Sequence, residues 1–456
     1  MRIPIAIGLG ASLLAIAAAG PFAADAQTLR EERVLQNDAV EVTATPRYQQ
    51  AVDLAEDTAE IVQPDPRHVE VMPWTLAQAT SLLEVINNID NEGLNPGDYL
   101  PGQLSAALET GEGQALDELA TELFVWLAED RRDGRTPMES RRQWFVVDPD
   151  MERTPNAAVL EQALATGDIN GTLETLRPTH PDYAALREEL ATSTEPARRR
   201  LIRANMDRWR WLARDLGGQY LITNVPEYQL RLTVNNRIIR TYRTIVGQPG
   251  RNATPQLAET VEGVIFNPTW TVPQSIVVGE GLGNRVLNNP TWARNNGYRG
   301  TRAANGFITV VQQPGGGNSL GAMKLDMPNE HAIFLHDTPN KNMFHRDARA
   351  LSHGCIRTER AVELAMTIAI LGQGATRDEV VAISNSGEYT RVPVEKTMPV
   401  YITYFTMGRD IEGEMRTFND IYSRDAPVFA ALDSPRVSNR SRFSTEEVIV
   451  NEDPGL

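Results

Sequence analysis

The sequence predicts a multi-domain α+β protein, with a helical N-terminal domain followed by a mainly β domain. The first indication is a change of hydrophobic spacing after Gly217 and Gly218, from the i, i+3, i+4 pattern of helices to the alternation of strands. The second is the length of 456 residues, which exceeds one small core and favours two or three domains. Charged residues make up 23% and apolar residues 41%, as in ordinary soluble globular proteins.

The N-terminus has the order of a secretory signal. Arg2 precedes an apolar stretch over residues 3–20, and a small-residue cleavage site follows at 24–26. We expect residues 1–26 to be a cleaved signal peptide. An uncleaved membrane anchor is the alternative, because the apolar stretch is almost long enough to span a bilayer. Residues 27–68 are polar and without periodicity, and they are expected to form a flexible tether.

The helical domain is expected over residues 69–217. An apolar stripe with helical spacing runs from Leu76 to Ile89, and Gly93 ends it. A second strong pattern covers residues 115–132. Three weaker helical patterns complete the domain: 157–165, 180–190 and 198–216.

The β domain is expected over residues 218–434. The pair Asn235-Asn236 is a turn signal of the kind that joins two strands of a hairpin. The expected strands are 220–225, 228–234, 238–246, 261–267, 307–312, 332–335 and 400–406. One buried helix is expected over 358–371, capped by its first residue, and a disordered polar tail is expected over 435–456.

The formal net charge of −16 at pH 7 limits the partners that the chain can bind. Nucleic acid is excluded as a partner, because its polyanionic backbone requires a basic surface. Docking on anionic lipid through a basic patch is disfavoured for the same reason. No cofactor is predicted.

Cys355 is the only cysteine in the chain. In an exported protein it cannot form an internal disulfide, so it is either a packing residue or a reactive group. Four of the six histidines precede it closely: His331, His336, His345 and His353. Because a neighbouring imidazole makes thiolate available at neutral pH, the pattern predicts a cysteine-nucleophile enzyme that works outside the cytoplasm.

The immediate surroundings of Cys355 fit nucleophilic catalysis. The residue lies just before the expected buried helix, where unpaired N–H groups and the helix dipole stabilise a thiolate. Gly354 leaves the backbone open, so that the amides of residues 354–356 could donate to a developing oxyanion. His336, at the end of an expected strand, could take the thiol proton. Arg357 could hold a substrate carboxylate through a bidentate contact.

Two other interpretations of Cys355 are open. A free cysteine is most often a small buried hydrophobe, although here a polar Ser-His-Gly loop surrounds it. A zinc site formed by Cys355, His336 and His353 is conceivable, but the paired spacing of structural zinc sites is absent. His331 and His345 are expected to be surface or loop residues.

The segments 336–338 and 352–357 resemble the signature of the L,D-transpeptidases, peptidoglycan enzymes with a β-sandwich catalytic domain. They read His336-Asp337-Thr338 and Ser352-His353-Gly354-Cys355-Ile356-Arg357. Further segments resemble the large periplasmic subgroup of Gram-negative bacteria: 209–211, 266–270, 335–339 and 420–422. The resemblance covers roughly residues 74–432 and includes that subgroup's helical scaffold domain.

The resemblance implies a role for each residue of these segments. Cys355 would be the nucleophile and His336 the general base, with the backbone carbonyl of Asp337 orienting the imidazole. His353 and Gly354 would shape the oxyanion hole. Substrate binding is implied for three residues: Arg357, Ser352 and Asn318.

Two features depart from the family pattern. Members outside the subgroup usually have glycine where Asp337 stands, and a free carboxylate there would change the electrostatic field on His336. The large members also insert a glycan-binding module between their two domains. Here only a short connector after Leu190 is present, so targeting to the wall must come from the scaffold, the cleft or a partner.

The implied reaction is a two-step acyl transfer between peptidoglycan stem peptides in the periplasm, which forms 3→3 crosslinks through a Cys355 thioester. The segment 279–317 is a candidate lid against water, or else an ordinary surface insertion. The same motif suits water as acceptor, in an L,D-carboxypeptidase or endopeptidase, or the N-terminus of an outer-membrane protein. A silent wall-binding protein is the third possibility. Carbapenems, which acylate the thiol of this family, are expected to add to Cys355.

Overall fold

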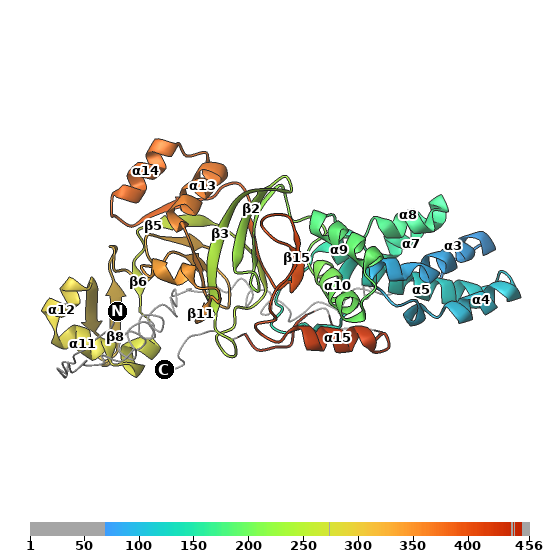
Figure 1. Cartoon of the computed structure of the whole chain (residues 1–456), viewed down its shortest axis with the longest axis horizontal. Helices are drawn as coiled ribbons and strands as arrows, with labels where there is room; N and C mark the ends of the chain where they lie inside the picture. Colours follow the sequence, from blue (N-terminus) through green and yellow to red (C-terminus); the bar gives the residue numbers. More distant parts are fainter. Residues whose placement is uncertain (1–68, 273, 439–440, 442, 449–456) are drawn as a thin grey trace, which may run out of the picture.

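The computed structural model describes residues 69–272, 274–438, 441 and 443–448. The predicted signal peptide (1–26) and tether (27–68) lie outside these residues. Figure 1 shows an elongated molecule with helices at one end and the sheet in the middle. The helices α11 (Leu282–Asn288) and α12 (Pro290–Asn295) lie at the opposite end. Within the described residues, no helix has both the length and the apolar character needed to cross a bilayer.

The helices α3, α4, α5, α7 and α8 of the helical half share one hydrophobic core. The first of these helices begins where Thr75 and Gln78 form a capping box, and it ends at Asn88. Leu82, Leu123 and their neighbours on other helices are fully buried in this core. The helices are α3 (Leu76–Asn87), α4 (Pro101–Thr110), α5 (Gln114–Asp133), α6 (Asp150–Arg153), α7 (Asn156–Thr166), α8 (Ile169–Glu174), α9 (Pro181–Thr192) and α10 (Pro196–Trp209). Three short turns of 3-10 helix are also present: η1 (Ile89–Glu92), η2 (Pro96–Tyr99) and η3 (Met138–Ser140).

The first three strands form a meander. They are β1 (Gln219–Asn224), β2 (Gln229–Val234) and β3 (Arg237–Gly247). Asn235 and Asn236 both have positive φ, 49° and 57°, which confirms the predicted two-residue turn between β2 and β3.

The remaining strands extend this meander into one long sheet with the order β13-β5-β9-β10-β12-β3-β2-β1-β14-β4, and β11 pairs with β3. They are β4 (Leu257–Thr260), β5 (Gly263–Phe266), β9 (Met323–Asp326), β10 (Leu335–His336), β11 (Ala350–Ser352), β12 (Ile356–Thr358), β13 (Thr390–Pro393) and β14 (Pro399–Thr403). Side chains from both ends of the order, among them Val400 and Phe266, lie in one hydrophobic core. The sheet therefore curls around that core, and the predicted succession of a helical domain and a β-rich domain is confirmed.

The helix after Cys355 begins later than predicted. Thr358, the predicted cap, lies in β12, because residues 357 and 358 pair with β3 at Ile245 and Thr244. The helix α13 (Ala361–Gln373) follows, with Arg360 as its N-cap at φ 51°. It packs on the curled sheet, and α14 (Arg377–Asn385) packs against it (Figure 1).

The segment predicted as a long loop over 279–317 is mostly ordered structure. After the short π-helix η4 (Ser275–Gly279) come α11, α12 and two paired strands, β7 (Tyr298–Arg302) and β8 (Ile308–Gln312). Strand β8 also pairs with β6 (Trp270–Thr271), which makes a separate three-stranded sheet. Val286 and Ile308 belong to the main core, so the segment is anchored at its base.

The last helix returns to the helical half. After the β15 (Met407–Arg409) and β16 (Met415–Thr417) hairpin, α15 (Asp425–Asp433) packs against α10. Arg208 of α10 lies 2.6 Å from the Asp425 carboxylate, and both side chains are almost buried. A separate hydrophobic cluster joins α9, α10, β1, β14 and α15. The helical and β-rich halves therefore share one continuous interface.

The predicted disordered tail is partly wrong. The described residues after α15 form no helix or strand, yet they contact the helical half. The Arg436 guanidinium pairs with Asp130 at 2.8 Å and with Glu129 at 3.0 Å, and its side chain is only 3% exposed. Arg436 also lies over the Trp126 ring. This part of the tail is fixed by buried charge rather than solvated.

Candidate active site

His336 is the last residue of β10, and Cys355 directly precedes β12, the neighbouring strand. Strands β10 and β12 are parallel, with His336 opposite Arg357, and the Ile356 amide donates to the Phe334 carbonyl at 3.0 Å. Because partners in register point to the same face, the His336 and Arg357 side chains face the same side of the sheet. The Phe334 and His336 rings lie 5.5 Å apart.

The thiol of Cys355 sits at the edge of the hydrophobic core. The residue is 4% exposed, and its Sγ lies 3.5 Å from the Ala332 carbonyl oxygen. Ala332 has a positive φ of 52°, an uncommon conformation for alanine, which places its carbonyl against the sulfur. The predicted helix N-terminus is not beside the thiol, because β12 follows Cys355 directly. The helix dipole therefore cannot be the group that activates this cysteine.

Hydrogen bonds within the loop 352–355 fix the nucleophile. The Ser352 hydroxyl donates to the Cys355 carbonyl at 2.7 Å and accepts from the Gly354 amide at 3.3 Å. Gly354 has a φ of 141°, which favours glycine at this position. The Thr254 hydroxyl donates to the Gly354 carbonyl at 2.7 Å and accepts from the Gly247 amide at 2.9 Å. The loop is thereby held from both sides.

These hydrogen bonds correct two predictions. Of the three amides proposed for the oxyanion hole, those of Gly354 and Ile356 already have protein acceptors. Ser352, proposed to bind substrate, is 3% exposed and uses its hydroxyl inside the loop. Its place is that of a positioning residue for Cys355.

His336 is a neutral imidazole in a positively charged environment. It is fully buried, and burial together with the charges of Arg357 and Lys324 lowers its pKa to about 3. Backbone groups of Asp337 and Leu320 lie against the ring and oppose this shift without offsetting it. Neither ring nitrogen forms a well-aligned hydrogen bond with the residues that the structure describes. The imidazole is therefore unprotonated at pH 7 and available as a base.

Asp337 uses its carboxylate to hold the neighbouring loop. One carboxylate oxygen accepts from the Ala322 amide at 2.9 Å, and the other pairs with Lys341. A Cβ at Gly321 would lie within 2.5 Å of this side chain, and Gly321 also has a φ of 65°. The backbone of Asp337 lies against the His336 ring, and its role in orienting the imidazole stays a prediction. The acid is neutralised by Lys341 rather than directed at the base.

Arg357 and Asn318, proposed to bind substrate, are both buried. Arg357 is 0% exposed, and Met343 of η5 (Lys341–His345) lies 3.5 Å from its Nη1 atom. Asn318 is 1% exposed, and its Nδ2 donates to the carbonyls of Pro268 and Gln313, each at 3.0 Å. Protein groups cover both side chains in this structure, and their role in substrate binding stays a prediction. The charge of Arg357 lies beside His336.

The other predicted histidines lie apart from one another. His353 is half-buried in the nucleophile loop, and His345 is exposed at the end of η5. His331, expected at the surface, is 5% exposed and packs on Phe145, with ring centroids 4.2 Å apart. Within the residues that the structure describes, no group of three potential ligands could hold a metal ion, so the zinc interpretation of Cys355 has no support.

Sequence reasoning missed two residues of this site. Thr254 lies far from the motif in sequence, and nothing in its local pattern signals a contact with Gly354. Lys324 pairs across the sheet with His336, and its Nζ lies 3.7 Å from the centre of the Phe334 ring. Only the pairing of β9 with β10 reveals this second cation beside the base.

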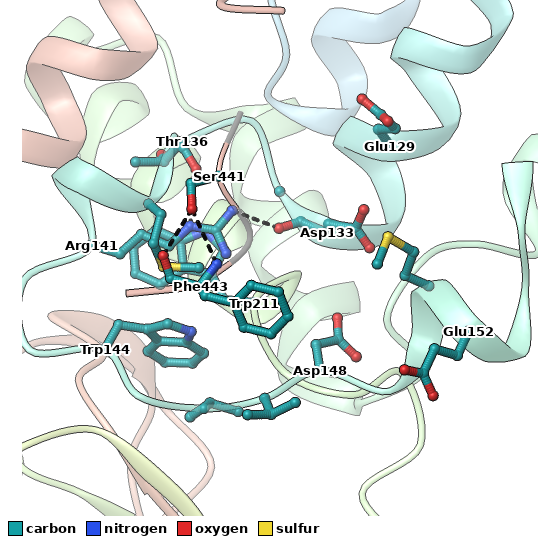
Figure 2. A pocket seen from close by; sticks show the side chains of 15 residues that line it. Glu129, Asp133, Thr136, Arg141, Trp144, Asp148, Glu152, Trp211, Ser441 and Phe443 are labelled. Atoms are coloured by element: carbon teal, nitrogen blue, oxygen red, sulfur yellow. Dashed lines mark hydrogen bonds between the residues drawn. The ribbon is translucent and has the colours of Figure 1, made fainter. Parts of the chain in front are cut away.

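One hollow lies in the helical half, far in sequence from Cys355. Figure 2 shows it, with Trp144, Trp211 and Asp148 among the residues that line it. Burial and the neighbouring Asp150 raise the pKa of Asp148 to about 7. Phe443 of the tail completes the wall. This hollow is a feature of the helical half and takes no part in the geometry of the thiol.

A buried thiol directly before β12 and a neutral imidazole at the end of the adjacent strand β10 fit a cysteine-nucleophile site. Comparison with known families agrees with this class. Residues 218–402 match the model of the L,D-transpeptidase catalytic domain, and residues 73–190 match the model of the scaffold domain. The chain therefore contains a region that matches the L,D-transpeptidase catalytic domain, preceded by a region that matches the scaffold domain, which confirms the resemblance.

One curated relative and two solved structures are similar over part of the chain. A Haemophilus influenzae protein described as an L,D-transpeptidase is 30% identical over 223 residues, which are 46% of this chain and 45% of that protein. The chain thus matches less than half the length of this relative. An L,D-transpeptidase from Mycobacterium smegmatis is 13% identical, with a TM-score of 0.21, over 41% of this chain and 58% of that chain. The Mycobacterium tuberculosis L,D-transpeptidase 3, in complex with a faropenem-derived adduct, is 11% identical, with a TM-score of 0.20, over 41% and 60%. Such low scores support no conclusion about this chain.

Proposed function

We propose that this protein is a peptidoglycan L,D-transpeptidase that forms 3→3 crosslinks between stem peptides through a thioester on Cys355. The observation that carries the proposal is that Cys355 directly precedes β12, which pairs in parallel with β10, the strand that ends at His336. The match of residues 218–402 to the catalytic domain supports the same chemistry. Donor and acceptor are both peptide stems of the cell wall.

In the first step the Cys355 sulfur attacks the carbonyl carbon of the third stem residue, the L-centre of diaminopimelate. His336 accepts the thiol proton, the C–S bond forms, and the bond to the terminal D-alanine breaks. The protonated imidazole then returns this proton to the departing amine. The products are a thioester and free D-alanine.

In the second step the side-chain amine of another stem attacks the thioester. A C–N bond forms, the C–S bond breaks, and the acceptor amine loses a proton to His336, which returns it to the sulfur. Water competes with the amine at this step, so a closed site favours crosslinking over hydrolysis. The anchored segment 279–317 is part of the proposal as the element that would cover the thioester.

The electrostatics of His336 suit these proton transfers. With Arg357 and Lys324 beside it, a resting imidazolium is unfavourable, so the base is free to accept a proton. Once the thiol has lost its proton, the sulfur anion offsets the two cations and stabilises the imidazolium. The ion pair is therefore formed during the reaction and is not the resting state.

The test is product analysis by mass spectrometry. The full-length protein is incubated with muropeptides that end in a tetrapeptide stem. We expect release of D-alanine together with dimers linked between two diaminopimelate residues. Release of D-alanine without dimers, even at high acceptor concentration, would show a carboxypeptidase and overturn the crosslinking proposal. Cys355→Ala is the matched control, and we expect its rate to fall at least about a thousandfold.

A periplasmic location is the second part of the proposal. It rests on the order of basic, apolar and small residues over 1–26. The measurement is fractionation of a Gram-negative host that expresses the full chain, with the N-terminus of the product sequenced. Recovery of the uncleaved chain in the cytoplasm would contradict it.

A further inference from the structure

The scaffold domain contains a second polar cavity, of about 320 Å³, far in sequence from Cys355. Its walls come from α3, η1, α5, α8 and α9, which lie together at the helical end of the molecule (Figure 1). Asn88, Asn91 and Asn170 line it together with the charged groups. Amide side chains supply both donors and acceptors, as a ligand with peptide groups requires.

One buried carboxylate, that of Glu92, organises the arginines of this cavity. Glu92 is 3% exposed, and its carboxylate contacts Arg187 at 2.9 Å and Arg177 at 3.1 Å. The Tyr183 hydroxyl donates to it at 2.7 Å, and Arg210 lies at 3.9 Å. Its acceptor positions are therefore already used by partners other than Arg131.

Arg131 is the cation of this cluster that lacks a carboxylate of its own. It is 4% exposed and lines the cavity, and its Nε and Nη1 atoms have no hydrogen-bond partner in the part of the chain that the structure describes. Its pKa is lowered by burial, and Arg210 and Arg177 lower it further, while Glu92 opposes the shift. A buried guanidinium without such partners carries a free-energy cost that a bound anion would remove.

Two arginines and three glutamates line the cavity, and two of the glutamates, Glu84 and Glu174, are exposed at its rim. The inner charged groups are Arg131, Arg187 and Glu92, two guanidinium groups against one carboxylate, so that the interior has an excess of one cation. The Arg187 side chain is 35% exposed, so a ligand that enters from solvent can reach it as well as Arg131.

We propose that this cavity binds a carboxylate-bearing ligand, an acidic amino acid derivative or the acidic part of a peptide, with Arg131 and Arg187 holding the carboxylate. The planar fork of a guanidinium group matches a carboxylate. The surrounding asparagines bind the amide groups of the same ligand. The site lies outside the catalytic domain and gives the scaffold a binding role beyond the proposed transfer reaction.

Isothermal titration calorimetry of the full chain at low salt, with N-acetylglutamate as the probe, tests the proposal. We expect saturable binding at one site, weakened roughly ten- to a hundredfold in Arg131→Gln, because a charge-assisted hydrogen bond is lost. Arg153→Gln is the matched control, since this arginine has an exposed side chain and only a 4.0 Å contact with Asp150. We expect the control to bind as the wild type does.

Two further arms keep the experiment decisive. Arg187→Gln removes the half-exposed partner and replaces Arg131→Gln as the test if circular dichroism shows that the latter is unfolded. Inorganic phosphate is titrated in parallel and should bind more weakly than N-acetylglutamate. The proposal is overturned by an absence of saturable heat, by unchanged affinity in the folded arginine variants, or by a preference for phosphate. Transpeptidase activity is not part of the readout.

Discussion

At the scale of single residues, two cations beside His336 set the protonation state of the candidate base. Lys324 lies opposite it on β9 and Arg357 opposite it on β12, so the imidazole is flanked by positive charge on both sides of β10. Burial alone would already disfavour the imidazolium. The result is a resting site with a neutral base, in contrast to the preformed thiolate–imidazolium pair that a helix dipole would favour.

The first prediction concerns stability against acid. Histidine in an unfolded chain titrates near pH 6.5, whereas the pKa of His336 is lowered to about 3 in the fold. Below pH 6.5 the unfolded state therefore binds more protons, and the free energy of unfolding falls as pH falls, until the folded pKa is reached. The slope contributed by this one residue is about 1.4 kcal/mol per pH unit.

Urea unfolding at a series of pH values between 7 and 4.5 measures this slope. We expect His336→Asn to have a shallower decline than wild type by about that amount. His331 and His180, whose pKa values burial lowers to about 4, should each add to the wild-type slope in the same direction. An identical slope in wild type and His336→Asn would contradict the burial of a neutral imidazole.

The second prediction concerns acylation of Cys355. A strained β-lactam carbonyl is an acyl donor, so a carbapenem should open on the Cys355 sulfur and remain as a thioester. Intact-mass spectrometry of wild type after incubation should show one adduct, and Cys355→Ala should show none. Persistence of the adduct in Cys355→Ala, or its absence from wild type, would place the reactive group elsewhere.

The chemistry of the candidate site was predictable from residue types, but the burial of its side chains was not. A lone cysteine preceded by histidines indicates a nucleophile and a base, and the fold brings the segments of Cys355 and His336 together through the pairing of β12 with β10. The burial of Arg357 depends on η5, which folds back over the guanidinium group from outside the motif. The side-chain amide of Asn318 likewise donates to the carbonyl of Pro268, which is distant in sequence. Contacts of this kind leave no local pattern.

At the scale of elements, the loop before β12 is held by a threonine in another loop, the connection between β3 and β4. The Thr254 hydroxyl joins the Gly354 carbonyl to the Gly247 amide, and the Tyr422 hydroxyl meets the Thr254 amide at 3.3 Å. Cys355 is therefore positioned from outside its own motif.

The third prediction is that Thr254→Val lowers kcat while KM changes little. The substitution keeps the shape of the side chain but leaves a buried carbonyl and a buried amide without partners, at a cost of about 1–3 kcal/mol. The rate at which Cys355 reacts with iodoacetamide should rise relative to wild type, because release of the loop makes this buried thiol more accessible. Thr254→Ser retains the hydroxyl and should restore both rates. Failure of serine to restore them would mean that the hydrogen bonds are not the cause.

The elements themselves were predicted unevenly. Long periodic helices such as α5, and the hairpin at Asn235-Asn236, follow from local pattern and turn chemistry. The helix after Cys355 was placed too early, because its apolar composition does not reveal that residues 356–358 pair as a strand first. Within the segment 279–317, the strand expected over 307–312 is confirmed as β8, whereas α11 and α12 were not predicted, because they are short and the glycines and asparagines obscure their pattern.

At the scale of the whole molecule, the chain crosses between its halves twice. It leaves the helical half at α10, forms the sheet, and returns through α15 to pack on α10 again. The ion pair of Arg208 with Asp425 joins α10 to α15 where the chain returns. Sequence order alone suggested two successive domains with a free tail, because pairing between residues some two hundred positions apart has no local signature.

The fourth prediction tests whether the tail is part of the folded molecule. The Arg436 guanidinium is buried against Asp130, which is itself 0% exposed and accepts a hydrogen bond from Tyr99 at 2.9 Å. Removal of one partner of a buried ion pair leaves an uncompensated charge, so Arg436→Ala should lower the free energy of unfolding by about 3–5 kcal/mol. The matched control is Arg416→Ala, whose 61% exposed side chain pairs with Asp410 and should cost less than about 1 kcal/mol. Chemical denaturation of both variants and of wild type measures the difference. Equal stabilities would mean that the tail is solvated in solution and that the contact with α5 contributes nothing to the fold.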